Sequence, residues 1–102
     1  MTSVTLEELH ADRFAEYIHS EFQVLDDLPA RFTLRLVQVQ ERLKLPHQES
    51  FSLLFRGPAQ YFMPQGIHKL KHSSLGEIDL FLVPVGQDAE GFLYEADFNR
   101  LI

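Results

Sequence analysis

The chain has no cysteine, and this absence excludes disulfide bonds, thiolate metal ligands and cysteine nucleophiles. It also has no long hydrophobic run. The longest strongly apolar stretch, residues 80–85, is far shorter than the roughly 20 residues with which a helix crosses a bilayer. The first eight residues have neither the basic start nor the apolar centre of a secretory signal. These absences predict a cytoplasmic protein without membrane contact.

Clusters of basic residues are missing as well. Nine Lys and Arg residues are scattered among 15 Asp and Glu residues, and the formal net charge is −6. Nucleic acid is therefore not an expected partner, because phosphate binding requires clustered Lys and Arg. Hydrophobic residues make up 45% of the 102 residues, and nine of them are Phe, which is enough for one core. We expect a single domain over residues 1–102.

Residues 1–20 have the pattern of a helical segment. Thr5 and Glu8 stand at capping-box spacing, which predicts a helix start. The apolar residues that follow recur at roughly helical spacing, and the spacing is broken around residues 10–12. We therefore expect short helical pieces that pack on one end or edge of a larger β domain, because helices this short are marginal alone.

Residues 21–102 alternate with a period of two, which predicts strands. A turn cluster at residues 26–29 ends the first strand, and Pro84 marks a strand end or a sheet edge. The phase of the alternation changes at Val37, which predicts a β-bulge or burial on both faces. Six strands without helices between them predict a mainly β fold, an antiparallel sandwich or small barrel. The expected interior contains the residues Phe32, Phe51, Phe55, Phe81, Phe92 and Phe98.

One hairpin is specified by charge and hydrophobicity together. If the chain folds back at residues 73–76, Lys69 stands opposite Asp79 and Lys71 opposite Glu77. The same register sets two apolar pairs opposite each other, Leu70 with Ile78 and Ile67 with Phe81. Opposite charges across an antiparallel pair contribute roughly 0.2–1 kcal/mol, and a slip by one residue would turn the apolar set to the wrong face.

Several blocks of the second half resemble a known family. They are residues 51–58, 64–66, 75–77, 80–86, 94–96 and 98–99, and they are similar to blocks in a family of small bacterial proteins of unknown function. This resemblance implies no catalytic residues and no cofactor. Some members lie near genes for phage-tail-like proteins, which implies a structural or assembly role.

The residues themselves give little evidence of a metal or acid–base site. His68 and His72 would share a strand face, but their backbones would stand roughly 13 Å apart, too far for one zinc ion. We expect solvated or half-buried histidines, with no metal and no cofactor. The acid pairs Glu77/Asp79 and Glu95/Asp97 each share one strand face, and a solvated row explains them better than general acid–base chemistry does.

Nucleophile and phosphate motifs are also missing. Ser50, Ser52, Ser73 and Ser74 lie in strands or turns, outside any nucleophile elbow. The five glycines are spread over turns and form no phosphate loop. We therefore expect no enzyme activity and no small-molecule substrate.

The segment from Arg56 to Gly66 is the candidate interaction site. Tyr61, Phe62 and Met63 place three large apolar side chains in a loop, beside Arg56. Such a loop packs over a barrel mouth, which is the favoured interpretation, or it contacts another chain. Arg56 either faces a partner or bonds loop carbonyls at the strand end.

Two functions follow from these observations. The first is a non-enzymatic structural or adaptor protein that acts through protein–protein contacts, at exposed strand edges or at the loop of Tyr61, Phe62 and Met63. Its partner is another protein or a second copy of the chain. The second is a small β-barrel that binds a small ligand. A cavity of about 300 Å³ or more inside the barrel would favour the second.

Overall fold

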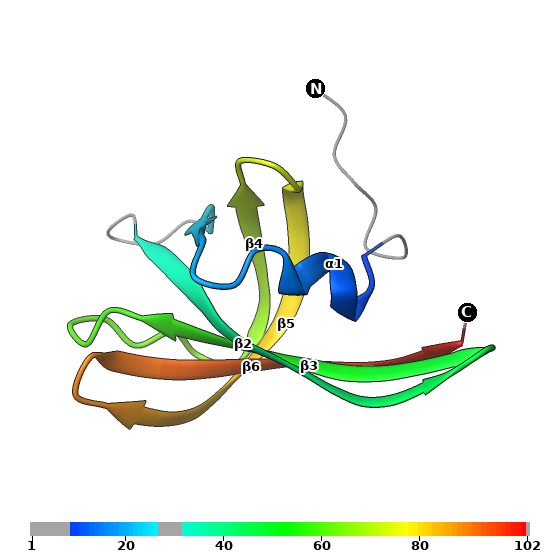
Figure 1. Ribbon diagram of the computed structural model, residues 1–102. Coiled ribbons are helices and arrows are strands. Elements are labelled where there is room, and N and C mark those ends of the chain that lie inside the picture. The colour runs from blue at the N-terminus through cyan, green and yellow to red at the C-terminus, as the bar shows by residue number, and fades with distance from the viewer. Residues whose placement is uncertain (1–8, 27–31, 102) are drawn as a thin grey trace.

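The computed structural model describes residues 9–26 and 32–101 (Figure 1). Within these residues, six antiparallel strands close into a barrel in the order β1-β2-β3-β6-β5-β4. This arrangement confirms the predicted mainly β fold with a short N-terminal helix. The elements are α1 (Ala11–Ala15), β1 (Glu21–Val24), β2 (Thr33–Leu45), β3 (Gln48–Gly57), β4 (Gly66–His72), β5 (Gly76–Asp88) and β6 (Gly91–Leu101).

Some predicted features lie outside the described residues. The predicted capping box at Thr5 and Glu8 is one of them, and most of the predicted turn at residues 26–29 is another. Among the residues described, α1 is five residues long, and no helix has the length and apolar character needed to span a membrane.

The register of the β4–β5 hairpin is the predicted one. Lys69 pairs with Asp79, Lys71 with Glu77, Leu70 with Ile78 and Ile67 with Phe81. On β4 the side chains of His68, Leu70 and His72 are buried, and on β5 those of Ile78, Leu80 and Leu82. The alternate positions face outward, because successive side chains of a strand point to opposite faces.

The interior is only partly the one expected. Phe51 and Phe55 are fully buried, together with Phe22, whose ring meets that of Phe55 edge-on at 5.3 Å. Phe32, Phe92 and Phe98 are partly buried and pack against this core. The prediction for Phe81 was wrong, because its side chain is 51% exposed. Phe81 lies two residues from Asp79 on the same strand and therefore shares the outward face.

Register shifts bend the strands at three places. The first lies between Leu36 and Gln38, where the change of phase at Val37 predicted a bulge. A second shift follows between Glu41 and Leu43 on β2, and a third lies beside Pro84 on β5. The β4 ladder ends at Leu82, so the missing N–H of Pro84 lies beyond it.

The helix covers the end of the barrel where β5 and β6 separate (Figure 1). The ring of Phe14 packs 6.1 Å from Phe51 and 5.9 Å from Phe98, between centroids. The buried carboxylate of Glu49 on β3 accepts hydrogen bonds from the His10 ring (3.0 Å) and from the Ala11 N–H (3.5 Å). Apolar packing and a buried acid thus hold α1 on one end of the barrel, as expected.

Candidate functional site

The loop between β3 and β4 is largely packed. Met63 is fully buried, and its N–H donates to the Tyr94 hydroxyl at 2.9 Å. The ring of Tyr61 lies 5.2 Å from that of Phe32. Phe62 differs, because it is 51% exposed while its ring meets that of Phe92 edge-on. The favoured interpretation, packing over the barrel mouth, therefore describes Tyr61 and Met63 and leaves Phe62 at the surface.

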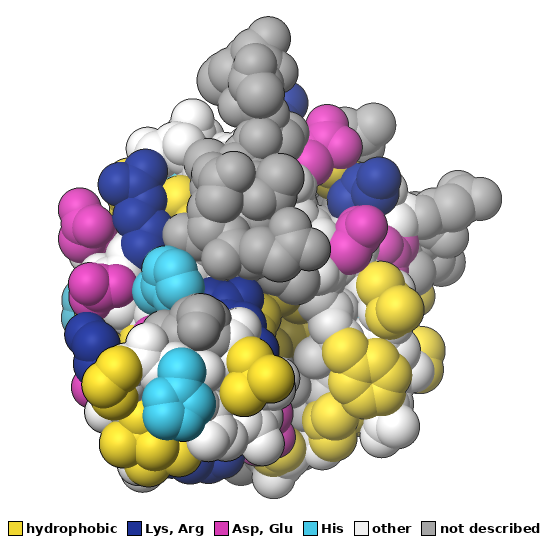
Figure 2. All heavy atoms as spheres, turned by 90° about the vertical axis from the view of Figure 1, so that its right-hand side faces the viewer, with side chains coloured by type: hydrophobic (Ala, Val, Ile, Leu, Met, Phe, Trp, Pro, Cys, Tyr) yellow, Lys and Arg dark blue, Asp and Glu magenta, His cyan; other side chains and the backbone are white. Residues whose placement is uncertain are grey.

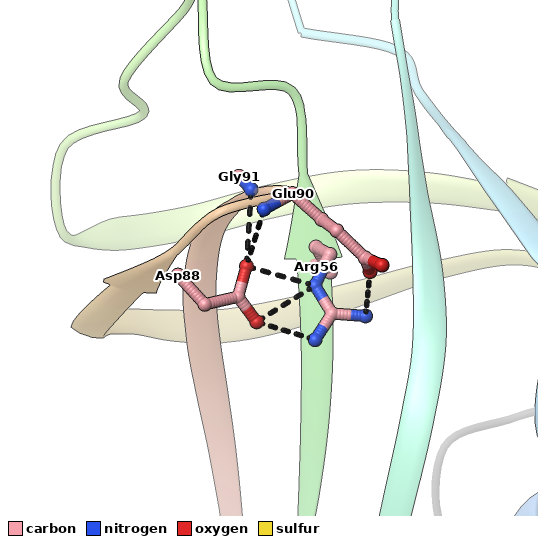
Figure 3. Close-up of polar contacts among 4 residues, drawn as sticks. All are labelled: Arg56, Asp88, Glu90 and Gly91. Atoms are coloured by element: carbon pink, nitrogen blue, oxygen red, sulfur yellow. Dashed lines mark hydrogen bonds and ion pairs between the residues drawn. The ribbon is translucent and has the colours of Figure 1, made fainter.

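Arg56 connects β3 to the β5–β6 turn (Figure 3). Its Nε and Nη2 donate to the carboxylate of Asp88, at 3.2 and 2.5 Å, and Nη1 lies 3.1 Å from the Glu90 carboxylate. The Asp88 Oδ1 also accepts the N–H groups of Glu90 (2.9 Å) and Gly91 (3.1 Å). The hydrogen bond between the two side chains lowers the pKa of Asp88 and raises that of Arg56. Arg56 is thus bound by carboxylates, not by loop carbonyls.

A solvent-open hollow of about 440 Å³ lies beside this cluster. It is lined by two arginines, Arg35 and Arg56, and by two glutamates, Glu21 and Glu90. The four charges balance, so the hollow has no strong preference for an anion or a cation. The role of Arg56, Tyr61, Phe62 and Met63 in contacting a partner stays a prediction.

His72 is buried and hydrogen-bonded in a way that fixes its tautomer. Its Nδ1 accepts the backbone N–H groups of Ser74 (3.0 Å) and Leu75 (3.2 Å), so the ring proton is on Nε2. Nε2 lies 2.9 Å from Ser20 Oγ, which donates its own proton to the Tyr17 carbonyl at 2.5 Å. Burial lowers the pKa of His72. A histidine held in this form cannot take a proton from Ser20, so the pair is not an activated nucleophile.

His68 is also buried, and both of its ring nitrogens face oxygen atoms. Nδ1 is bonded to the carboxylate of Asp26, and Nε2 lies 2.8 Å from the Pro64 carbonyl. Asp26 accepts the Lys69 N–H as well, at 2.9 Å. The expectation of solvated or half-buried side chains is therefore wrong for His68 and His72, because both point inward from β4. Within the described part of the chain, no three His, Asp or Glu residues are grouped as metal ligands.

The acids Glu95 and Asp97 of β6 lie beside a cation. Arg42 of β2 is 4.0 Å from the Glu95 carboxylate and 3.4 Å from that of Asp97. Partial burial raises the pKa of Glu95, and the neighbouring Asp97 raises it further, whereas Arg42 opposes both. Glu95 and Asp97 thus form a pair of surface carboxylates whose negative charge is partly neutralised by Arg42.

The outward side of the β4–β5 hairpin carries exposed apolar side chains. We call it the outer face and define it by Ile67, Lys69 and Lys71 of β4 and Glu77, Asp79 and Phe81 of β5, which are the outward positions of the paired residues. Ile67 is 72% exposed and Phe81 51%. Val85, which is 50% exposed, lies farther along β5, at the register shift beside Pro84. An open hollow of about 350 Å³ adjoins the outer face, between residues 79–81 of β5 and residues 96–100 of β6.

Figure 2 shows hydrophobic side chains gathered mainly in the lower half of the side that it views, with acidic and basic side chains above them on the right. On the outer face, the exposed pair of Ile67 and Phe81 was not predicted from the sequence. The sequence does contain a signal for it. Side chains two residues apart on a strand point to the same face, so Ile67 lies on the side of Lys69 and Phe81 on the side of Asp79, and both charged residues are exposed. For the Ser20–His72 contact the sequence holds no comparable signal, since the two residues are 52 positions apart.

The chain belongs to the family described as a domain of unknown function (DUF6916), whose model matches residues 9–98. No curated protein and no solved structure matches the chain. The resemblance to a family without an assigned activity is thus confirmed at the level of the family.

Proposed function

We propose that this chain is a non-enzymatic structural or adaptor protein that acts through protein–protein contacts on the outer face of β4–β5. The observation that carries the proposal is the exposure of Ile67 and Phe81 on one side of a two-stranded hairpin. Scattered apolar side chains are normal on a surface, but adjacent large ones commonly mark a contact site. Ile67 and Phe81 are direct cross-strand neighbours.

The charge of the protein supports a protein partner. The outer face carries two lysines and two acids beside the apolar residues, and the whole chain has a net charge of −6. A nucleic-acid surface would be dominated by positive charge. A role in a larger assembly, such as a phage-tail-like one, belongs to this proposal, and so does a cytoplasmic location, which the absence of cysteine supports.

The geometry of the polar side chains supports a role without catalysis. His72 is held as the neutral tautomer that cannot act as a base toward Ser20. Both ring nitrogens of His68 are occupied by protein oxygens, and Arg56 is bound by two carboxylates. Each of these groups already has protein partners, whereas a catalytic group needs one position open to its substrate.

The alternative function is binding of a small ligand. One observation favours it, namely that the open hollow of about 440 Å³ beside Arg35 and Arg56 falls within the usual size of ligand sites. The barrel interior is less suitable, because it is filled by fully buried side chains such as Phe22, Phe55 and Tyr94. A small molecule that binds saturably to the wild type, and no longer to Arg35→Ala, would support this alternative.

Capture experiments in a cell lysate test the main proposal. Two variants, Phe81→Ser and Phe62→Ser, form a matched pair, because both rings are 51% exposed but only Phe81 lies on the outer face. We expect the tagged wild type and Phe62→Ser to retain the same bound protein, which can include a second copy of the chain, and Phe81→Ser to lose it. Equal capture by all three proteins would refute the proposal. Loss with Phe62→Ser alone would move the contact to the β3–β4 loop.

A further inference from the structure

The outer face carries its two signs of charge on separate strands. Lys69 and Lys71 form a basic column on β4, and Asp79 and Glu77 form an acidic column on β5. The register sets Lys69 opposite Asp79 and Lys71 opposite Glu77, at the same height along the hairpin. Below them, Ile67 stands opposite Phe81. Each position on β4 is therefore matched on β5 by an opposite charge or by a second apolar residue.

This pattern makes the face complementary to itself. Consider a two-fold axis that lies in the contact plane, parallel to the strands and midway between them. The axis exchanges the strands, so β4 of one copy faces β5 of the other at unchanged height. Lys69 then faces Asp79 of the second copy, and Ile67 faces Phe81 of the second copy. A two-fold axis perpendicular to the strands would instead place β4 of one copy against β4 of the other. Lysines would then face lysines or Ile67 of the second copy, without an opposite charge.

We propose that the partner of the outer face is a second copy of this chain, in an isologous dimer with that two-fold axis. The inference rests on the proposed function, because it names the partner of the same surface. Two sheets pack face to face about 10 Å apart, with their strands aligned to within about 30°. A lysine and an aspartate reaching from opposite sheets can span that gap, and Ile67 and Phe81 can fill it between the sheets.

Reversing the charges at positions 69 and 79 distinguishes this dimer from other arrangements of two copies. Lys69→Glu places glutamate against Asp79 of the second copy, and Asp79→Lys places lysine against Lys69 of the second copy. Both repulsions occur twice in a dimer, so we expect each variant alone to dissociate at least about tenfold more readily than the wild type. In an equal mixture of the two variants, every contact becomes an opposite-charge pair, and the mixture should form a heterodimer.

The double variant Lys69→Glu, Asp79→Lys sharpens the test. It should associate with itself and no longer with the wild type, because the charges at positions 69 and 79 have been exchanged. As a control, Lys44→Glu makes the same change of net charge as Lys69→Glu, at an exposed lysine of β2 away from the outer face, and should leave association unchanged. Association is measured by sedimentation velocity over a wide concentration series, with labelled copies for the mixtures. Circular dichroism confirms that each variant is folded.

The outcomes separate this inference from the proposed function. Recovery of association in the mixture, and self-association of the double variant, support the dimer. A wild type that stays monomeric, or single variants whose mixture does not associate, overturns it. If the purified chain is monomeric while Phe81-dependent capture of another protein persists, the second copy is the wrong partner and the contact surface stands. If the purified chain is monomeric and capture does not depend on Phe81, both proposals fail.

Discussion

Replacing His72 by asparagine should make the stability of the barrel less sensitive to acid. The His72 ring is buried, neutral and bonded through both nitrogens, and burial lowers its pKa from the ordinary value of 6.5. Below pH 6.5 the unfolded chain therefore binds a proton at His72 that the folded chain does not. The wild type should lose up to about 1.4 kcal/mol of unfolding free energy per pH unit from this residue, until the folded pKa is reached.

The variant His72→Asn keeps one part of this arrangement and removes the rest. The asparagine Oδ1 can accept the N–H groups of Ser74 and Leu75 in place of Nδ1, but the bond to Ser20 and the packing of the ring against Tyr17 are lost. Loss of one buried hydrogen bond and part of an aromatic contact should cost about 2–3 kcal/mol near neutral pH. That cost should shrink as pH falls, because only the wild type loses the histidine contribution.

Urea denaturation followed by far-UV circular dichroism measures both quantities. Unfolding free energies are compared between about pH 8 and about pH 5.5 for the wild type, His72→Asn and His47→Asn. His47 lies exposed in the β2–β3 turn, and its replacement should change stability by less than about 0.5 kcal/mol. A difference between wild type and His72→Asn that stays constant with pH would refute the assignment of His72 as a neutral buried ring.

Three further substitutions, the first with a matched control, test other contacts. Gly91→Ala should destabilise the barrel by at least about 2 kcal/mol in urea denaturation, because Gly91 has a φ of 152° and an added Cβ would overlap the Gly57 carbonyl of β3. Gly86→Ala is the control. An added Cβ there meets one atom at 4.0 Å, so this variant should cost less than about 1 kcal/mol. Tyr94→Phe leaves the buried Met63 N–H without its acceptor and should cost about 1–3 kcal/mol by the same assay. Glu49→Gln removes the carboxylate that binds the start of α1, so hydrogen exchange should accelerate in residues 9–15 and much less in β4.

The strands and one register could be predicted because their signals are local. Lys69 and Asp79 stand on either side of a short turn, and charge and hydrophobicity agree on the same pairing. The change of phase at Val37 likewise marked a bulge. Closure of the barrel was left open beside a sandwich, because it depends on the four-residue strand β1 pairing with β4, some 45 residues further along. A short strand carries too little pattern to identify its partner.

The polar contacts of the site could not be predicted for a related reason. Arg56 binds Asp88 across 32 residues, and His72 binds Ser20 across 52, and each contact depends on side-chain directions that arise only after the barrel closes. Phe81 is a different case. Its large apolar side chain suggested a place in the core. However, Phe81 lies two residues from Asp79, so both side chains point to the same, outward face of the strand. The charged pairs fix the register, and the register therefore decides which face Phe81 occupies.

The exposed apolar pair sets a limit on how tightly two copies can associate. Burying a whole side chain of this kind contributes about 1.5–3 kcal/mol, and 72% of Ile67 and 51% of Phe81 are still exposed. Summed over both copies, the gain is about 4–7 kcal/mol at most, which is of the same order as the cost of bringing two molecules together. The dimer should therefore be weak and should depend on its Lys69–Asp79 pairs. Because such pairs are screened by salt, sedimentation at high salt should show weaker association than at low salt. Association that strengthens with salt would mean that apolar burial alone holds the copies together, and the charge columns would then have no part in choosing the partner.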